Sequence, residues 1–412
     1  MPDKKNWTGM ITLLLRPILP EDTWAFLGDF ACFLYDLDIT GVPRTELLIQ
    51  EDWGRAVEQI SQTHLGLHRF SSSLRHVNNQ SRETTVEILR KLYVNPETLH
   101  ENTATVFQEA LRQAVAIRND RDFITPAPLA DLMAHMLQPR VGDRILDPVC
   151  GSGGLLAACT ACCSGSHFRG MDIHSLFAEI TYFNLHFRGA TDLDISVGDF
   201  FEYADKIADT FDIVLANPPY NSNLQQTIRF LISILKVLKS GKRCGVLVPE
   251  GLLSNTAAST VVDFKRWLLR HHSLEAVISL PNKIYRPYTE SKSSLLLLRK
   301  DCAMSNKPVF YAELPEFTGT EKDFSPSVYR DDMEHIAEVW NRYTENPMYR
   351  DPLFLTVTPE VLEWRKYDLS FNTHSTPVYP ANRAPVKQWR MQLSQRQNML
   401  DQLFQDYIEE KP

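Results

Sequence analysis

The sequence predicts an α/β protein built around a doubly wound, mostly parallel sheet. Short apolar segments alternate with stretches of helical periodicity, and strands that alternate with helices form parallel sheets. The segments are almost continuously apolar, which is typical of strands covered on both faces. Seven such strands are predicted, over residues 144–146, 168–171, 193–197, 211–216, 244–248, 274–280 and 294–298.

Segments of different character flank this region, which we place at residues 123–300. Aromatic and aliphatic residues at helical spacing predict a helical amino-terminal domain over residues 1–122. Residues 301–385 contain many prolines and aromatic residues and predict an irregular carboxy-terminal extension. Residues 386–412 predict an amphipathic helical tail, which docks on a partner subunit or on the protein itself.

The composition is that of an ordinary globular protein, with 43% hydrophobic and 23% charged residues. No apolar stretch reaches the roughly 18 to 20 residues that span a bilayer, and the amino terminus lacks the features of a signal peptide. The seven cysteines, an odd number in apolar contexts, predict reduced thiols and a cytoplasmic protein. The group at residues 159–163 has no second ligand pair at zinc-site distance, so we expect helix packing and no metal.

The tetrapeptide Asn217-Pro218-Pro219-Tyr220 directly follows the apolar segment 211–216. The two prolines stiffen the loop and donate no N–H group. The Asn217 oxygen and a prolyl carbonyl can each accept one N–H of a planar –NH2 group, while Tyr220 offers an aromatic face. The alternative is a simple stop between strand and loop, because Asn-Pro commonly marks turns.

Three further features precede the tetrapeptide at the predicted ends of strands. Residues 147–154 form a glycine-rich turn between a strand and a helix, where the backbone can approach a ligand closely. Asp172 ends the second strand, where an acidic residue can accept both ribose hydroxyls of a nucleoside. Asp199 ends the third strand beside Phe200, a pair suited to the amino edge and ring of adenine. Because open α/β sheets bind ligands at this edge, the joint occurrence favours catalysis over a loop stop.

With these motifs the chain resembles the class I, S-adenosylmethionine-dependent N6-adenine DNA methyltransferases. It is more closely similar to the modification subunits of type I restriction–modification systems, through segments 245–251 and 278–289 and the fragment 367–370. The resemblance covers about residues 123–300. It implies a seven-stranded, Rossmann-like methyltransferase sheet, S-adenosylmethionine as cofactor, and methyl transfer to N6 of a flipped-out adenine in DNA.

The resemblance also implies roles for individual residues. The implied catalytic residues are Asn217, Pro218, Pro219 and Tyr220. The implied cofactor-binding residues are Phe123, Thr125, Pro126, Asp147, Pro148, Cys150, Gly151, Ser152, Gly153, Gly154, Asp172, Ile173, Asp199 and Phe200. The implied contacts with the target base are Tyr220, Tyr285 and Tyr288. Independently of the resemblance, Thr125-Pro126 reads as a helix N-cap followed by proline at the first helical position.

The net charge of −8 bears on the partners, because an independent nucleic-acid binder normally has a basic patch. We therefore expect a hetero-oligomer in which DNA is bound together with a separate specificity subunit, with a restriction subunit as a further partner. Two alternatives remain open. The same chemistry serves a base in RNA or a glutamine amide in a protein, and a methyltransferase-like scaffold in a DNA-binding complex would be no enzyme. The segments after residue 240 favour DNA.

Overall fold

The computed structural model describes residues 11–12, 23–41, 59–60, 62–64, 102–117, 124–219, 223–282, 284–285, 291–302, 307–317 and 325–375. The chain divides into two compact units, Met1–Thr373 and His374–Pro412. Every strand of the sheet lies in the first unit. The helical tail predicted for residues 386–412 lies outside the described residues.

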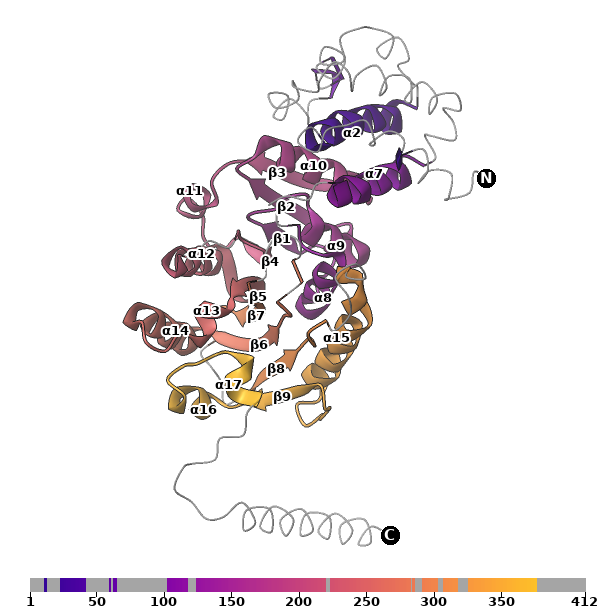
Figure 1. Cartoon of the computed structure of the whole chain (residues 1–412). Helices are drawn as coiled ribbons and strands as arrows, with labels where there is room; N and C mark the ends of the chain where they lie inside the picture. Colours follow the sequence, from indigo (N-terminus) through magenta and orange to yellow (C-terminus); the bar gives the residue numbers. More distant parts are fainter. Residues whose placement is uncertain are drawn as a thin grey trace, which may run out of the picture. The chain divides into compact units, whose positions relative to one another are not determined.

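The centre of the first unit is one sheet of nine strands (Figure 1), in the order β3-β2-β1-β4-β5-β7-β6-β8-β9. The strands β1 to β5 pair in parallel, whereas β7 is antiparallel to both of its neighbours. The order reverses between β1 and β4, which is the topological switch point where open α/β sheets bind ligands. The strands are β1 (Arg144–Asp147), β2 (His167–Asp172), β3 (Asp192–Val197), β4 (Phe211–Ala216), β5 (Leu238–Pro249), β6 (Ser273–Ser279), β7 (Ser293–Arg299), β8 (Val309–Glu313) and β9 (Phe354–Val357).

All seven predicted strands are present, as β1 to β7, but the predicted strand number was wrong. β8 adds to β6 in parallel and β9 adds to β8 antiparallel, so the sheet is larger and more mixed than expected. The prediction stopped at residue 300 because the chain beyond it lacks a regular alternation of strand and helix. The α/β class and the doubly wound order of the first strands are as predicted.

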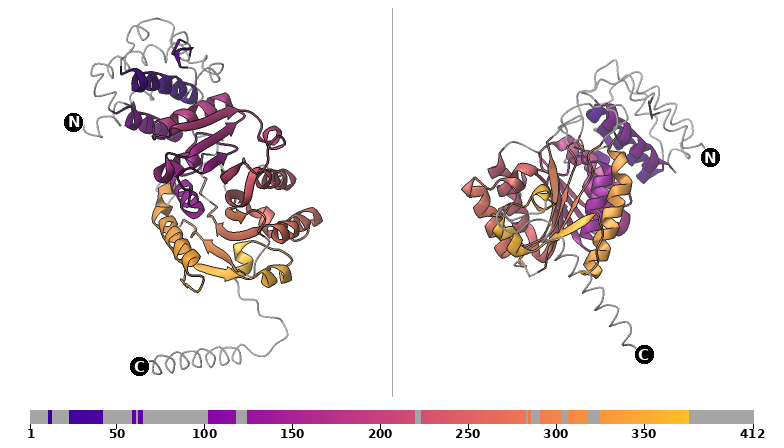
Figure 2. Two further views of the ribbon diagram at one scale, coloured as in Figure 1. Left: turned by 180° about the vertical axis from the view of Figure 1, so that it is seen from behind. Right: turned by 60° about the horizontal axis from the view of Figure 1, so that its bottom comes forward.

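Helices cover both faces of the sheet, and Figure 2 shows the resulting three layers edge-on. Successive residues of a strand point to opposite faces. Along β4, Ile213 and Leu215 belong to one hydrophobic cluster, and Val214 and Ala216 belong to the other. The first cluster includes α2 (Thr23–Thr40), α7 (Thr103–Ile117), α8 (Ala127–Leu137), α9 (Gly154–Cys163), α10 (Ser175–His186) and α15 (Arg330–Glu345). The second includes α11 (Phe200–Ala204), α12 (Leu224–Val237), α13 (Glu250–Ser254), α14 (Ser259–His271) and α16 (Pro359–Trp364).

The amino-terminal helices α2 and α7 pack on α10, at the β3 side of the sheet. Tyr35 of α2 lies in ring contact with Tyr182 and Phe183 of α10, and Phe107 of α7 contacts Phe187. Within the described parts of residues 1–122, the regular elements are helices. The domain boundary at residue 122 stays a prediction.

The segment predicted to be irregular, residues 301–385, is ordered where it is described. It contains β8, a 3-10 turn (Pro326–Tyr329), α15, β9, α16 and α17 (Phe371–Ser375). Trp340 of α15 is buried and its Nε1 donates a hydrogen bond of 3.1 Å to the Met136 carbonyl of α8. Phe310 of β8 stacks on Phe354 of β9 at 4.7 Å. The aromatic residues that suggested irregularity are therefore core residues of an extended sheet.

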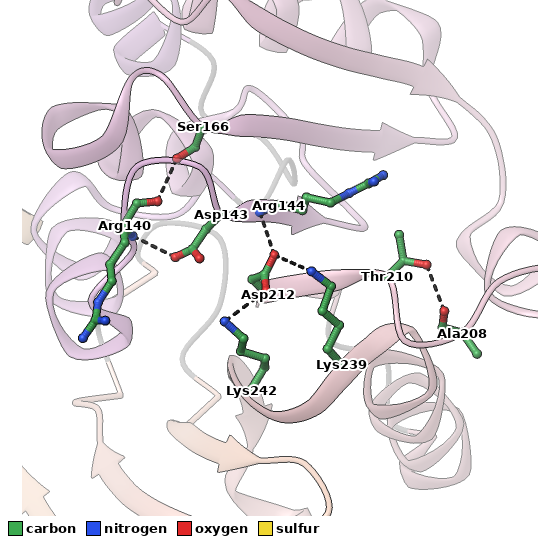
Figure 3. A network of polar contacts seen from close by, with 9 residues as sticks. All are labelled: Arg140, Asp143, Arg144, Ser166, Ala208, Thr210, Asp212, Lys239 and Lys242. Carbon is green, nitrogen blue, oxygen red and sulfur yellow. Dashed lines mark hydrogen bonds and ion pairs between the residues drawn. The ribbon is translucent and has the colours of Figure 1, made fainter.

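The amino-terminal ends of β1, β4 and β5 are joined by Asp212 (Figure 3). Its carboxylate accepts the backbone N–H of Arg144 at 3.1 Å and the ammonium of Lys239 at 2.8 Å, and it pairs with Lys242 at 3.0 Å. These hydrogen bonds, against the effect of burial, hold the pKa of Asp212 below its usual value. Because the contacts fix three neighbouring strands at one end, they help to fix the loops at the opposite end.

All seven cysteines are free thiols, as predicted. Cys159 and Cys163 are buried in α9, where the Cys163 thiol donates to the Cys159 carbonyl, so this group packs a helix as expected. Among the described helices, none has the length and apolar character needed to cross a membrane.

Candidate active site

A cavity of about 430 Å³ opens at the carboxyl ends of β1 to β5. Ten residues that the sequence assigned to the site line it, and they come from four different strand ends. They are Pro148, Gly151, Ser152, Asp172, Ile173, Asp199, Phe200, Asn217, Pro218 and Pro219. The structure thus brings the glycine-rich turn, the two aspartates and the first three residues of the tetrapeptide together in one cavity.

The glycine-rich turn between β1 and α9 is held by α10 from behind. Gly153 has a φ of 80°, and a Cβ there would lie 3.1 Å from the side chain of Thr181. The Thr181 hydroxyl donates a hydrogen bond of 2.7 Å to the Gly151 carbonyl, and Asn184 Nδ2 donates one of 2.8 Å to the Ser152 carbonyl. Glycine is therefore required for both conformation and space, and α10 fixes the backbone that borders the cavity.

The two aspartates at the cavity are fixed by backbone N–H groups. Asp172 accepts from Gly151 at 3.0 Å through Oδ2 and from His174 at 2.9 Å through Oδ1. Asp199 caps α11, with its Oδ1 accepting the Phe201 N–H at 2.7 Å. Each carboxylate is thereby oriented at the end of its strand, on the cavity lining.

Asp147 lies beneath the turn and does not line the cavity. It is 1% exposed, and its Oδ1 accepts the Val149 N–H at 3.1 Å. Burial, together with the charge of Asp172 and against that hydrogen bond, raises the pKa of Asp147 to about 8. Burial likewise raises the pKa of the Cys150 thiol. The residues of the predicted cofactor set that lie off the lining are Thr125, Pro126, Asp147, Cys150, Gly153 and Gly154.

Among the described residues, the side-chain amide of Asn217 has a hydrogen-bond partner for its nitrogen but none for its oxygen. Its Nδ2 donates a hydrogen bond of 3.0 Å to the Thr125 hydroxyl. Its Oδ1 is buried and accepts no hydrogen bond within the described part of the chain. The residue is 7% exposed and lines the cavity. A buried acceptor without a donor is unfavourable by itself, so this oxygen is suited to a ligand that brings an N–H group.

The expected N-cap at Thr125 is not formed. α8 begins at Ala127 with Pro126 as its N-cap residue, and no side chain caps the helix. Pro128 supplies the proline of the first turn, one residue beyond the first helical position. The Thr125 hydroxyl is engaged with Asn217 instead of with the helix.

Three predicted site residues, Phe123, Tyr220 and Tyr288, lie outside the described residues. Tyr285 is described, but it is 1% exposed and is absent from the cavity lining. Its predicted contact with the target base therefore has no support from its position.

Residues that the sequence did not single out complete the lining. Gln226, Thr227 and Phe230 come from α12, directly after the tetrapeptide, and their spacing places them on one helix face. The helical spacing of these three residues could have been recognised in the sequence. The remaining lining residues reach the cavity through tertiary packing, which the sequence does not show. They are Ile124, Val149, His174, Phe177, Gly198, Phe201 and Pro249.

A cavity at this switch point, lined by residues from successive carboxyl ends of strands, is where open α/β sheets bind their ligands. The chain belongs to the N-6 DNA Methylase family, which it matches over residues 109–229 and 222–377.

The curated proteins to which the chain is similar include a restriction-enzyme methylase subunit and a tRNA methyltransferase. The chain is 23% identical over 265 residues to the type I restriction enzyme EcoEI methylase subunit of Escherichia coli, covering 57% of this chain and 53% of that protein. It is 30% identical over 138 residues to a tRNA (guanine(10)-N2)-dimethyltransferase of Methanothermobacter thermautotrophicus, covering 32% of this chain and 39% of that enzyme. The match thus spans about half or less of either relative.

The fold is shared with a solved protein over nearly the whole chain. A chain from a structure of a type I R-M system superimposes with a TM-score of 0.69 at 19% identity, covering 99% of this chain and 98% of that chain. A sequence identity of 19% is evidence for a shared fold only. The doubly wound α/β fold seen in the sheet order is therefore shared with that chain.

Proposed function

We propose that this chain transfers a methyl group from S-adenosylmethionine to N6 of an adenine in DNA, as the modification subunit of a type I restriction–modification system. The observation that carries the proposal is the buried Asn217 Oδ1, which has no donor among the described residues and belongs to a residue of the cavity that also holds Asp172 and Asp199. Family membership and the similarity to the EcoEI methylase subunit support it.

The residues present fit the cofactor. We assign Asp172 at the end of β2 to the ribose hydroxyls, Asp199 and Phe200 to the adenine, and the turn around Gly151 to close backbone approach, and their positions on the cavity lining support this assignment. A cavity of about 430 Å³ lies within the usual range of roughly 300 to 1,000 Å³ for small-molecule sites. When bound, the cofactor supplies an electrophilic methyl group on a sulfonium.

The chain's own contribution is to bind and orient the amine that is methylated. The exocyclic nitrogen of adenine is a poor nucleophile because its lone pair is delocalised into the ring. Asn217 Oδ1 and the Pro218 carbonyl accept its two N–H groups, which raises electron density on the nitrogen and directs its lone pair. Holding the amine nitrogen about 3 to 3.5 Å from the carbon that it attacks supplies the rest of the rate enhancement. The extra proton leaves after transfer, so no dedicated general base is needed.

The target adenine has to leave the duplex, which costs a few kcal/mol that stacking on an aromatic side chain offsets in part. Tyr220, directly after Pro219, is the residue we assign to this stacking. With a net charge of −8, the chain lacks the basic character that phosphate binding requires. We therefore assign sequence recognition and most phosphate contacts to a separate specificity subunit in a hetero-oligomer, with a restriction subunit as a further partner.

A second candidate is methylation of an exocyclic amine in RNA. The 30% identity to a tRNA (guanine(10)-N2)-dimethyltransferase favours it, because the same two acceptors bind any planar amine. That match covers 32% of this chain, against 57% for the EcoEI subunit, so DNA is the preferred substrate.

The test is transfer of a radiolabelled methyl group from S-adenosylmethionine to DNA, RNA and protein, with and without a candidate specificity subunit. Nucleoside mass spectrometry then identifies the methylated atom. The proposal predicts N6-methyladenine in DNA, formed only when the specificity subunit is present. Label in RNA or protein alone, or at another atom of DNA, contradicts the proposed function. Sequence-specific methylation by the chain alone contradicts its role as a dependent subunit.

A further inference from the structure

We infer that Trp24 of the amino-terminal helix α2 is a positioning residue for the cofactor cavity, because it holds one aromatic wall of that cavity in place. The inference deepens the proposed function and rests on it, since the proposed function assigns this cavity to S-adenosylmethionine. The wall is the side chain of Phe177, which lines the cavity near the start of α10. Three observations on α2 and α10 carry the inference.

The first observation is the contact between the two rings. The centroids of the Trp24 and Phe177 rings lie 5.4 Å apart with an interplanar angle of 67°, which is an edge-to-face pair. Trp24 is 1% exposed, whereas Phe177 is only partly buried and borders the cavity. Trp24 therefore supports Phe177 from the side of the hydrophobic core.

The second observation is that α10 contacts the glycine-rich turn and α2 with opposite faces. Phe177, Thr181 and Asn184 lie at positions i, i+4 and i+7, so they share one face. Thr181 and Asn184 hold the glycine-rich turn from this face. The residues that contact the rest of α2 lie on the other face, and they are Glu179, Tyr182, Phe183 and His186. Among the ring contacts between described residues of α2 and α10, that of Trp24 is the one that reaches the face of the turn.

The third observation is that α2 is anchored on α10 beyond Trp24. The Cys32 thiol donates to Glu179 Oε1 over 3.5 Å, and the Asp38 carboxylate lies 2.9 Å from His186 Nε2. The ring of Tyr35 lies 4.6 Å from the ring of the same histidine. Because these contacts fix where α2 lies along α10, the position of Trp24 against the cavity wall is set by the docking of the whole helix.

Phe177 connects Trp24 to the carboxylate that we assign to the ribose. Its ring lies 6.2 Å from the ring of His174, which also lines the cavity. The His174 N–H in turn donates to Asp172 Oδ1 over 2.9 Å. Without the Trp24 ring, Phe177 would gain freedom to leave this position, and cofactor binding would then include the entropic cost of ordering it again. Trp24 thus preorganises the cavity through Phe177.

The test measures the affinity of the full-length chain for S-adenosylmethionine by calorimetry, in wild type and in variants of α2. Trp24→Leu removes the ring, and Kd should rise about 3- to 10-fold, which is the factor expected for the loss of one edge-to-face pair. Trp24→Phe keeps an aromatic ring at this position and should keep Kd within about twofold of wild type.

Phe26→Leu is the matched control, because it removes another buried ring of α2, one that stacks on Phe30 of the same helix. Urea unfolding should show that both leucine variants are destabilised, since each loses buried side-chain volume. Only Trp24→Leu should weaken cofactor binding, and Phe26→Leu should keep Kd within about twofold of wild type.

A second readout is amide hydrogen exchange in residues 23–40, measured at cofactor concentrations that saturate each protein. Because coupling between two sites is reciprocal, S-adenosylmethionine should slow exchange in α2 of wild type by about 3- to 10-fold. In Trp24→Leu this slowing should be lost in α2 and kept in the glycine-rich turn at residues 147–154. If Trp24→Leu does not fold, Phe177→Leu removes the same ring contact from the cavity side, and the slowing in α2 should be lost there too.

Equal effects of Trp24→Leu and Phe26→Leu on Kd would overturn the inference, because Trp24 would then act through stability alone. Binding by Trp24→Phe that is as weak as binding by Trp24→Leu would also overturn it, as would unchanged exchange in α2 of wild type when the cofactor binds. Failure of the proposed function gives a different result. If wild type binds no S-adenosylmethionine, the proposed function and the inference both fall. If wild type binds it but methylates another group, only the proposed function falls, and the same measurements still decide the role of Trp24.

Discussion

Asn184 of α10 donates a hydrogen bond of 2.8 Å to the carbonyl oxygen of Ser152, in the turn that borders the cavity. Its own Oδ1 accepts Gln108 Nε2 of α7 at 2.9 Å and Arg188 Nε at 3.2 Å. The amino-terminal helix α7 is thereby connected to the cofactor turn through a single buried amide. A role for the amino-terminal helices in shaping the site follows from this connection.

Asn184→Ala should weaken S-adenosylmethionine binding and lower stability. The substitution leaves the Ser152 carbonyl without its donor, and an unsatisfied buried group costs about 1–3 kcal/mol. Calorimetric titration and urea unfolding measure the two effects. Gln108→Ala is the matched control, since it removes the outer hydrogen bonds to Asn184 and from Arg188 but leaves the donor of the Ser152 carbonyl in place, and it should have the smaller effect on affinity. Equal cofactor affinity in wild type and Asn184→Ala would mean that the turn does not depend on α10.

Gly153→Ala should be more harmful than Gly189→Ala, although both glycines have a φ of 80°. The left-handed conformation alone costs an alanine about 1–2 kcal/mol. At Gly189 nothing lies within 4 Å of the added Cβ, whereas at Gly153 the Thr181 side chain lies at 3.1 Å. The difference in unfolding free energy between the two variants isolates this contact. Only Gly153→Ala should also weaken cofactor binding, and equal effects at both sites would contradict the role of Thr181 behind the turn.

Asp147→Asn should change the pH dependence of stability. The folded-state pKa of Asp147 is raised from 3.8 to about 8, chiefly by burial. Between these values the unfolded chain releases the proton and the folded chain retains it, so wild-type stability falls as pH rises from about 4 to about 8. Asparagine abolishes this loss. Urea unfolding at pH 5 and pH 8 gives the free energy of unfolding of both proteins. The stability of Asp147→Asn relative to wild type should be higher at pH 8 than at pH 5. A stability difference that is the same at both pH values would contradict a neutral Asp147.

Asp212→Asn should have the opposite pH signature. The pKa of Asp212 is lowered in the folded state, because the hydrogen bonds from Lys239, Arg144 and Lys242 outweigh its burial. Its contribution to stability is therefore present above the unfolded pKa of about 3.9 and is lost as pH falls through the lower folded pKa. The variant should be less stable than wild type at pH 7, with a difference that shrinks in acid. A difference that persists at pH 2 would assign the effect to packing instead of charge.

Much of the fold was predictable from the sequence, because strands buried on both faces leave continuous apolar runs. β8 was missed although Val309-Phe310-Tyr311-Ala312 is such a run. α15 was missed although its buried residues Met333, Ile336, Trp340 and Tyr343 recur at helical spacing. Prolines near these segments obscured the apolar run of β8 and the helical spacing of α15. In addition, a local sequence pattern does not show that a strand will be added to the edge of an existing sheet.

The site was predictable to the level of motifs but not of individual side chains. Strand-end aspartates and the tetrapeptide could be placed at one sheet edge because parallel strands share that edge. Whether Asp147 faces the cavity or lies beneath the turn depends on the φ angles of Gly151 and Gly153, which sequence does not specify. The hydrogen bond of Thr125 likewise depends on where α8 begins, which is one residue later than the sequence predicted.

The central claim is that Asn217 Oδ1 binds the amine that is methylated and takes no part in holding the cofactor. Asn217→Ala tests it most directly, with Asn346→Ala as the same substitution in a turn after α15. Single-turnover methyl transfer at saturating S-adenosylmethionine should fall by about 100-fold or more, as when other preorganised hydrogen-bonding groups are removed. Calorimetric affinity for S-adenosylmethionine should stay within about twofold of wild type, as expected when only the transition state is affected. Undiminished transfer by Asn217→Ala, or a loss of cofactor affinity in that variant, would contradict the claim.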